Sequence, residues 1–469
     1  MAFTEFYSQT TGSNLNAGST TGDAAVFTFA NGNWDSTTGI FIATGADLSA
    51  IAVGMFASVY LDAATVGVFV GRITAVNDTT DTITVSLTAK SGTAPATGAT
   101  GRSIKIGGAW KGPNAAVAFP FGFITNTLTN AAGDYPRVNL KSGTTYSITA
   151  AMTHANAGSV TFQGYTTTVG DGGKAIIDGG TSGASYILLL VSGNDNFLTD
   201  IIFQNNGATG DEEGVRITGS RGQCLRVVAN SIRGNGLNGV GTVLFVECET
   251  YACNQANSSG KGGVLTNADA ILIRCFSHDN AGSNSSGFRT YGISANFQDC
   301  VADSNGGDGF LLDEWGIYTL SGCDSYNNGG NGFKLANDAI ATYYLESCNA
   351  VKNGAYGING STAQVRNGAI INCGFGSGTQ ANTSGTTTGL SAMVETGSIN
   401  YASNVTPWVD PANGDFRINL AAAKGTGRGA FTQTAPSYAG TVGYPDVGAA
   451  QHLETPGGVK IVGPGGLAG

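Results

Sequence analysis

Apolar residues recur at a nearly constant interval between Gly214 and Cys373, and each of them directly follows a glycine. Successive members of this series are 22 to 25 residues apart. The series consists of Val215, Val240, Val264, Phe288, Phe310, Phe333 and Ile358. A fixed period of this length is typical of a solenoid, in which each repeat forms one coil stacked on the next.

Cysteine and asparagine follow the same interval as the apolar series. The cysteines are 23 to 27 residues apart, at Cys224, Cys248, Cys275, Cys300, Cys323, Cys348 and Cys373. An asparagine stands five residues after each of four successive cysteines, at Asn280, Asn305, Asn328 and Asn353. We expect the apolar and cysteine series to stack inside the coils. The asparagines fit a bend, since Asn tolerates a left-handed backbone and its amide can hydrogen-bond along a stack.

The segments between these marks predict short β-strands. Ala270–Cys275 and Thr342–Cys348 are β-branched or aromatic and too short for helices. Three such strands and three turns fit into about two dozen residues at roughly 3.3 Å per strand residue, and equivalent residues then stack about 4.8 Å apart. The expected fold is therefore all-β, a right-handed parallel β-helix of about 22–25 residues per coil.

The chain outside these repeats predicts further β-structure. Residues 24–107 alternate short strands with Asp, Asn and Gly turns and lack the period of the coils. They indicate a small β-sandwich or barrel, inserted between an opening strand and the solenoid, in which Phe69–Val76 and Asp81–Leu87 form a hairpin. Ala115–Ala132 is the best helix candidate, and a helix there would cover the open first coil.

The expected domain organisation follows from these patterns. It consists of an opening strand at 1–23, a small β-domain and candidate anchor at 24–107, a capping helix region at 108–135, the β-helix at 136–380, a closing β segment at 381–452 that forms an irregular C-terminal cap, and a Gly/Pro-rich tail at 453–469.

Composition and charge exclude several classes of protein. Charged residues are 12% of the chain, too few for a conventional disordered protein despite 73 glycines. The formal net charge of −10 disfavours nucleic acid as a partner, which calls for clustered Lys and Arg. The first residues lack the positive and apolar regions of a secretory signal. No apolar run is long enough to cross a bilayer, so we expect no membrane insertion.

The cysteines are expected to be buried thiols. Stacked cysteines would have parallel Cα–Cβ bonds, which suit the dihedral angle of a disulfide badly. Buried thiols pack as small hydrophobic groups. No Cys-x-x-Cys pair occurs, and no histidine accompanies the cysteines at ligand spacing. We therefore expect no metal site and no cofactor.

Two copies of the coil phrase resemble the generic repeat of the pectate-lyase-like β-helix superfamily. They are Cys300–Leu312 and Cys323–Leu335. The opening residues Phe6–Gly18 and the closing residues Pro445–Ala449 are similar to the ends of such chains. The resemblance implies the fold. It does not select an activity, because the superfamily includes polysaccharide lyases, hydrolases, epimerases, bacteriophage tailspikes and adhesins.

The strongest candidates for chemistry lie in one coil. Asp313 and Glu314 stand beside Trp315, and a carboxylate pair next to an aromatic ring is what glycoside hydrolysis and sugar stacking use. We take Asp313 and Glu314 as candidate catalytic residues, and Trp315, Asp303 and Asp308 as candidate glycan-binding residues. The alternative is a solvated turn with one surface tryptophan.

Two other groups of titratable residues have simpler interpretations. Asp211–Glu213 is expected to be a solvated loop. His278 and Asp279 could form an acid–base pair, but they stand in the ordinary turn between a cysteine and an asparagine of the repeat.

A β-helix of this kind without a secretory signal is explained by a virion protein, which assembles in the host cytoplasm and acts outside the cell. The first hypothesis is a structural protein of a bacteriophage virion, such as a spike, a fibre or a capsid-decorating protein. Its N-terminal domain would bind other virion proteins, and its β-helix, as a homotrimer, would meet host-surface polysaccharide. One alternative is a polysaccharide lyase or glycoside hydrolase, although we lean against an enzyme. Another is a purely architectural virion component.

Overall fold

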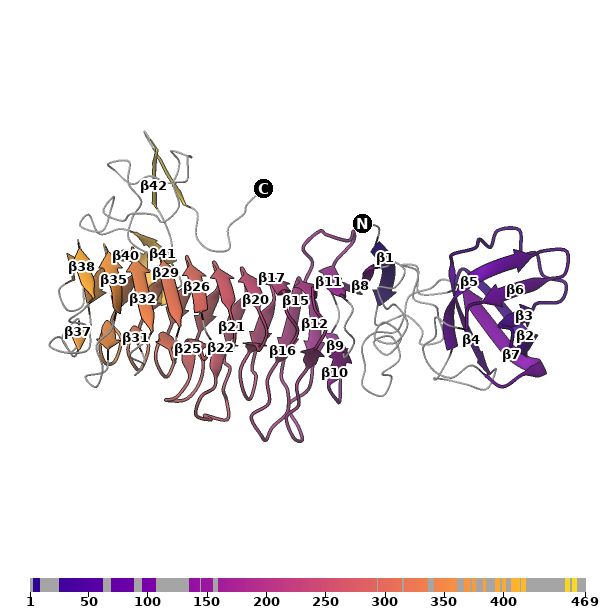
Figure 1. Ribbon diagram of the computed structural model, residues 1–469, viewed down its shortest axis with the longest axis horizontal. Helices are drawn as coiled ribbons and strands as arrows, with labels where there is room; N and C mark the ends of the chain where they lie inside the picture. The colour runs from indigo at the N-terminus through magenta and orange to yellow at the C-terminus, as the bar shows by residue number, and fades with distance from the viewer. Residues whose placement is uncertain are drawn as a thin grey trace. The chain divides into compact units, whose positions relative to one another are not determined.

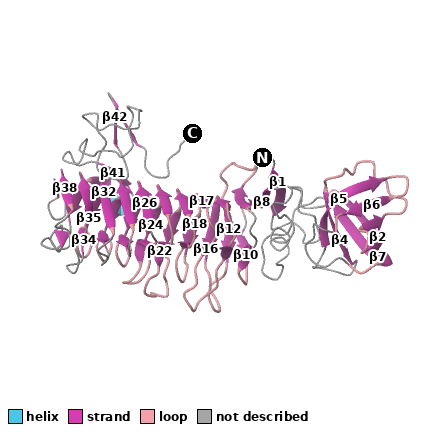
Figure 2. Cartoon of the chain, viewed as in Figure 1, coloured by secondary structure: helices cyan, strands magenta, loops and turns pink. Residues whose placement is uncertain are grey.

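The computed structural model describes most of the chain. The described residues are 3–8, 25–61, 69–87, 95–106, 135–143, 145–154, 159–292, 294–313, 316–335, 341–360, 367–371, 373–376, 383–384, 393–396, 399–401, 406–413, 415–418, 452–455 and 458–461. These residues are all-β apart from one short 3-10 helix, η2 (Pro411–Asn413) (Figure 2). None of the described segments is a helix long and apolar enough to cross a lipid bilayer. The expected helix at Ala115–Ala132 lies outside the described residues.

The chain divides into two compact units, and Figure 1 labels strands of both. The first contains residues 1–180 and 187–204, and the second contains residues 181–186 and 205–469. The parallel strands of the first unit are β1 (Phe3–Ser8), β8 (Tyr135–Lys141), β11 (Thr161–Tyr165) and β14 (Phe197–Thr199) in one row, β9 (Thr145–Ser147), β12 (Ala175–Asp178) and β15 (Ile201–Gln204) in the next, and β10 (Met152–His154) and β13 (Leu189–Val191) in the last.

The second unit contains three parallel sheets, and each coil adds one strand to each of them. Sheet I consists of β17 (Gly222–Leu225), β20 (Val243–Val246), β23 (Ala270–Ile273), β26 (Ser294–Gln298), β29 (Ile317–Ser321), β32 (Thr342–Glu346), β35 (Asn367–Ile371) and β38 (Val394–Thr396). Sheet II consists of β18 (Val228–Asn230), β21 (Glu249–Tyr251), β24 (Phe276–His278), β27 (Val301–Asp303), β30 (Asp324–Tyr326), β33 (Asn349–Val351), β36 (Gly374–Gly376) and β39 (Ile399–Asn400). Sheet III consists of β16 (Val215–Ile217), β19 (Leu237–Gly239), β22 (Gly262–Thr266), β25 (Ser286–Thr290), β28 (Phe310–Leu312), β31 (Phe333–Leu335), β34 (Ile358–Gly360) and β37 (Thr383–Ser384).

The phenylalanines of the apolar series form the predicted interior stack. Phe288, Phe310 and Phe333 pair in register along β25, β28 and β31. The ring centroids of Phe288 and Phe310 are 4.9 Å apart and those of Phe310 and Phe333 are 5.0 Å apart, with the planes tilted by 16° and 23°. All three side chains are buried. The prediction of stacked coils is confirmed.

One member of the apolar series was assigned to the wrong position. Val240 is 38% exposed, and Leu237 occupies the interior place between Val215 and Val264. This coil contains the glycine–apolar phrase twice, at Gly236 and at Gly239. Burial of the larger leucine decides which of the two enters the core.

The cysteine series also contains one misplaced member. Cys224 pairs with Phe245 in sheet I. The place equivalent to Cys248 is held by Val227. The carbonyl of Val227 accepts from the N–H of Glu249, as the carbonyl of Cys248 accepts from the N–H of Phe276 on the next coil. The interior takes either residue there, since both are small and apolar. All eight cysteines are free and buried, as predicted. Burial raises the pKa of the Cys253 thiol to about 12.

The asparagine series forms a continuous ladder of side-chain hydrogen bonds inside the bend. The Nδ2 of Asn280 donates to Oδ1 of Asn305 at 2.6 Å, Asn305 donates to Asn328 at 2.8 Å, and Asn328 donates to Asn353 at 2.9 Å. The left-handed backbone lies one residue earlier, at Asp279, Ser304, Asn327 and Lys352, with φ of 50–56°. Each asparagine therefore serves through its inward amide, and the expected left-handed role is wrong.

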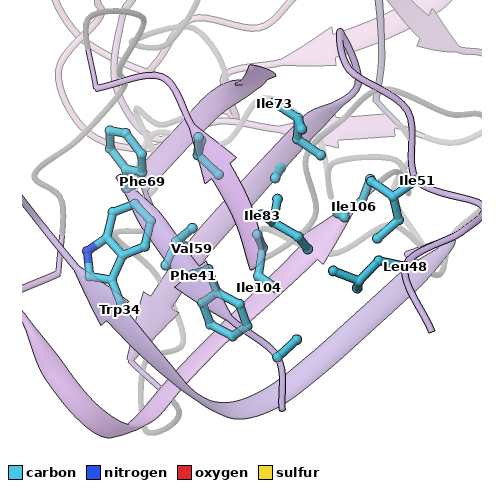
Figure 3. Close-up of a cluster of buried hydrophobic side chains, with 13 residues drawn as sticks. Trp34, Phe41, Leu48, Ile51, Val59, Phe69, Ile73, Ile83, Ile104 and Ile106 are labelled. Carbon is cyan, nitrogen blue, oxygen red and sulfur yellow. The ribbon is translucent and has the colours of Figure 1, made fainter. Parts of the chain in front are cut away.

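The small N-terminal β-domain is a closed antiparallel barrel with strand order β2-β3-β6-β5-β4-β7. The strands are β2 (Phe27–Asp35), β3 (Ile40–Ile42), β4 (Phe56–Leu61), β5 (Phe69–Asn77), β6 (Thr82–Val85) and β7 (Gly98–Ile106). Figure 3 shows its core, in which Trp34, Phe41, Phe69 and Ile104 are fully buried. β5 and β6 form the expected hairpin. β1 pairs in parallel with β8, so the barrel is inserted between two neighbouring strands of the first unit, as expected.

A hairpin after the last coils packs on the outer face of sheet II. β40 (Trp408–Asp410) and β41 (Asp415–Ile418) form an antiparallel hairpin. Trp408 and Phe416 pack on Tyr326, with centroids 5.5 and 6.1 Å from its ring, and form one buried cluster with Val301 and Val351. The C-terminal segment thus covers the side of several coils. Further along the chain, β42 (His452–Thr455) and β43 (Gly458–Ile461) form a second hairpin.

Candidate functional site

The outer face of sheet III carries a row of outward side chains. Side chains alternate between the two faces of a strand, so Phe288 points inward while Arg289 points outward, and Phe333 and Lys334 repeat this arrangement. Over this row lies a groove of about 730 Å³. Its lining residues are Ser259, Gly260, Ser283, Asn284, Ser286, Arg289, Gly307, Asp308, Leu311, Asp313, Gly330, Lys334, Leu335 and Asn359.

Two loops form one wall of the groove, and hydrogen bonds hold them together. Asn254 Nδ2 donates to Ser285 Oγ at 2.8 Å, and Asn254 Oδ1 accepts from the N–H of Ser258 at 2.9 Å. Gly260, at the tip of the first loop, has φ +82°, and a Cβ added there would lie 3.3 Å from Nη1 of Arg289. Only glycine fits this tip without strain and without crowding the arginine.

Arg289 is fixed at the base of the groove. Its Nη2 donates to Oδ2 of Asp313 at 2.8 Å. Its guanidinium lies over the ring of Tyr291, 4.2 Å from the centroid. A planar guanidinium held by a carboxylate and an aromatic face loses little further freedom when it meets a ligand.

Asp308 is the second carboxylate in the groove. Its Oδ1 accepts from both the backbone N–H and the Nδ2 of Asn331, each at 2.7 Å. Its Oδ2 lies 3.4 Å from Nζ of Lys334. The Asp308 side chain is nearly buried, whereas the Lys334 side chain is half-exposed. The groove therefore presents two cation–carboxylate pairs from neighbouring coils.

The structure brings some of the candidate residues together and separates others. Asp308 and Asp313 both line the groove. Asp303 does not join them, because it ends β27 in sheet II and the chain turns a corner before Asp308. Burial raises the pKa of Asp303 to about 6. Glu314 and Trp315 lie outside the described residues.

Sequence patterns did not reveal Arg289 and Lys334 as functional candidates. Each directly follows an interior phenylalanine, so alternation along the strand would have placed it on the outer face. Outer positions change from coil to coil, and no repeat marks them.

The expected solvated loop at Asp211–Glu213 is wrong for Glu213, which is only 2% exposed. Its carboxylate accepts from Arg216 Nε at 2.5 Å and from Asn238 Nδ2 at 2.8 Å, and it lies 3.6 Å from Lys261 Nζ. These cationic and amide donors compensate the cost of burying the charge. Lys261 directly follows Ser259 and Gly260 in the loop beside the groove. Its contact with Glu213 therefore also holds this wall of the groove in place.

A separate titratable cluster lies on the outer face of sheet II. His278 Nδ1 is 2.8 Å from Asp279 Oδ2, and its Nε2 is 3.1 Å from Glu249 Oε1. Burial lowers the pKa of His278, but the hydrogen bonds to both carboxylates outweigh it and raise the pKa above its ordinary value. The ring stacks on Phe276 with centroids 4.2 Å apart. The expected His278–Asp279 contact is therefore present, within a stacked and ion-paired arrangement.

No group of three or more His, Cys, Asp or Glu side chains that could hold a metal ion occurs in the part of the chain that the structure describes.

Comparison with known proteins bears on the fold. Residues 213–370 match the family model described as "Right handed beta helix region". No curated protein matches the chain.

Three solved structures are similar at low sequence identity. Pectate lyase Pel9A is 16% identical over 67% of this chain and 87% of that chain, with a TM-score of 0.41. The A-module of the mannuronan C-5 epimerase AlgE4 from Azotobacter vinelandii is 14% identical over 57% and 80%, with a TM-score of 0.41. The tailspike protein gp49 from Pseudomonas phage LKA1 is 10% identical over 82% of this chain and 64% of that chain, with a TM-score of 0.26. The family match agrees with the stacked coils, so the described strands within residues 213–370 form a right-handed parallel β-helix.

Proposed function

We propose that this protein binds polysaccharide in the groove over sheet III. The observation that carries this proposal is the lining itself, in which two cation–carboxylate pairs stand among serine and asparagine side chains. A sugar offers many hydroxyl groups, each both a donor and an acceptor. Carboxylates, amides and cations on a rigid sheet supply matching partners, and charge-assisted hydrogen bonds are the stronger kind.

The repeat of the coils favours a polymeric ligand. Outward residues of neighbouring strands are about 4.8 Å apart, and the pairs Arg289–Asp313 and Lys334–Asp308 come from successive coils. Along this row Leu311 lies between Arg289 and Lys334, so a ligand that contacts both cations must extend across three coils, as a chain molecule can. A rigid row also orders few protein side chains on binding, which lowers the entropic cost.

We further propose that the protein is a structural component of a bacteriophage virion, as a spike, a fibre or a capsid-decorating protein. The barrel would bind other virion proteins, and the β-helix, in a homotrimer, would meet host-surface polysaccharide. A separate barrel inserted between β1 and β8 supports an anchoring role. Eight buried free thiols suit assembly in the reducing cytoplasm of a host.

A polysaccharide-degrading enzyme is the second candidate function, because Asp308 and Asp313 both line the groove. Glycoside hydrolysis needs one carboxylic acid that keeps its proton to protonate the leaving group. Both carboxylates are already engaged by protein donors, because Asp308 accepts from Asn331 and Asp313 accepts from Arg289. Binding without cleavage is therefore the function that we favour.

Glycan binding by calorimetry tests the proposal. We expect the wild-type chain to bind a polysaccharide and Arg289→Gln to weaken that binding about tenfold, since one charge-assisted contact is lost. Lys352→Gln, which makes the same charge change on the sheet II side of these coils, is the matched control and should bind normally. Equal binding by Arg289→Gln and wild type would place the site elsewhere.

Two further measurements separate the alternatives. Reducing-end and unsaturated-uronate assays on the bound polymer should detect no product, and product formation that Asp313→Asn abolishes would establish the enzyme. Mass spectrometry of purified phage particles should detect the chain. Its absence from particles would contradict the virion proposal and leave the groove proposal standing.

A further inference from the structure

We infer that the groove over sheet III selects uncharged polysaccharides over polyuronates. This inference rests on the proposed function and adds the chemical class of the ligand. It depends on how the charges of the groove are paired, because a polymer with one carboxylate per sugar needs cations that no protein carboxylate already occupies.

The described lining residues carry equal numbers of positive and negative charges. The cations are Arg289 and Lys334, and the anions are Asp308 and Asp313. Each cation lies against one anion, with N–O distances of 2.8 Å for Arg289–Asp313 and 3.4 Å for Lys334–Asp308. A ligand carboxylate that approached either cation would therefore also meet an aspartate.

The remaining lining residues have no charge. They are serine, asparagine, glycine and leucine. On preceding coils, Arg216 and Lys261 both lie against the buried carboxylate of Glu213. These cations are thus also engaged by a protein anion.

The long-range field acts in the same direction as the local pairing. The chain has a formal net charge of −10, which repels a polyanion and slows its association. A hydroxyl-rich uncharged polymer meets no such repulsion. It can also donate hydrogen bonds to the aspartates and accept them from Arg289 and Lys334, so that all four charged groups become favourable contacts.

The test compares uncharged and anionic polymers under two salt conditions. The probes are dextran, a galactomannan, polygalacturonate and alginate, measured by calorimetry in NaCl on the order of 0.02 M and 0.5 M, where the screening length differs several-fold. We expect an uncharged polymer to bind more tightly than both polyuronates, with an affinity that salt changes less than about threefold. Tighter, strongly salt-dependent binding of a polyuronate would overturn the inference while the proposed function stands. Binding of no polymer would contradict both.

Charge-changing variants test the pairing directly. Asp313→Asn releases Arg289 and gives the groove a net positive charge, so its affinity for polygalacturonate should rise about tenfold at low salt while its affinity for the uncharged polymer falls. Asp269→Asn, an exposed aspartate on the bend before β23, makes the same change outside the groove and is the control. If both variants gain equally for polygalacturonate, net charge rather than the groove controls binding, and the inference fails.

Discussion

The outer faces of sheets II and III belong to the same coils but are used differently. On sheet II, Val301 and Tyr326 lie under Trp408 and Phe416 of the C-terminal hairpin, in one buried apolar cluster. On sheet III the described residues over β25–β31 carry a polar groove with two ion pairs. The interior beneath both faces repeats the same phenylalanine, cysteine and asparagine stacks.

This difference separates stability from recognition. The interior and the covered face bury apolar surface, which is the main source of folding free energy. The open face presents two partly buried ion pairs, and ion pairs near a surface contribute less to stability than the burial of large apolar side chains. Coil repeats thus form the framework, and the outward residues determine which face is covered and which face carries the groove that we propose to bind a ligand.

The largest effect is expected from the interior that the two faces share. Phe310→Ala removes a fully buried ring from the middle of the stack and leaves a cavity. We expect the free energy of unfolding to fall by about 4 kcal/mol, measured by urea denaturation. Asn296→Ala, an exposed residue on sheet I, is the control and should change it by less than about 0.5 kcal/mol. Similar small losses in both variants would contradict the stacked interior.

A smaller and local effect is expected on the covered face. Trp408 is 2% exposed, whereas its neighbour Val409 is 46% exposed. Trp408→Ala should weaken the packing of the β40–β41 hairpin on sheet II by about 3 kcal/mol. Hydrogen exchange should then increase in residues 406–418, β27 and β30. Val409→Ala should leave that exchange unchanged. Glycan binding should persist in both variants, and its loss in Trp408→Ala would show that the two faces are not independent.

The charges of sheet II predict a pH dependence. The pKa of Asp303 is raised to about 6, so the folded state holds this proton more tightly than the unfolded state does. The free energy of unfolding should therefore fall as pH rises from about 4 through 6, by roughly 2 kcal/mol. The raised pKa of His278 acts in the same direction, because its stabilisation is lost as pH rises. In Asp303→Asn the fall should be smaller, and in Asp269→Asn it should match wild type. Denaturation curves at several pH values check this, and an unchanged slope in Asp303→Asn would refute it.

The smallest effect on stability is expected on the open face. The Lys334 side chain is half-exposed, and its Nζ lies 3.4 Å from Oδ2 of Asp308. Lys334→Gln should change the free energy of unfolding by less than about 0.5 kcal/mol while weakening glycan binding several-fold. A large loss of stability without a change in binding would make the pair a structural element and would remove the distinction between the two faces.

Inner and outer positions also differ in how far the sequence predicts them. Phe288, Phe310 and Phe333 were predictable because an interior stack needs like residues at each step. Val240 and Cys224 were misplaced because coil length varies and similar phrases compete within one coil.

The candidate site was predictable only in part. Asp308 and Asp313 were placed in one coil region correctly, and both line the groove. Asp303 is five residues from Asp308 but lies on another sheet, because the chain turns a corner between them. Arg289 and Lys334 follow no repeat, because outward residues do not pack in the interior stack and need not resemble their neighbours on adjacent coils.

Hydrogen exchange of the full chain with and without its tightest-binding polysaccharide tests the central claim most directly. Residues 254–261 and 281–286, the loops beside the groove, should gain protection on binding, while β24, β27 and β30 of sheet II should not. Protection confined to sheet II or to the barrel, with the loops unchanged, would contradict a glycan site over sheet III.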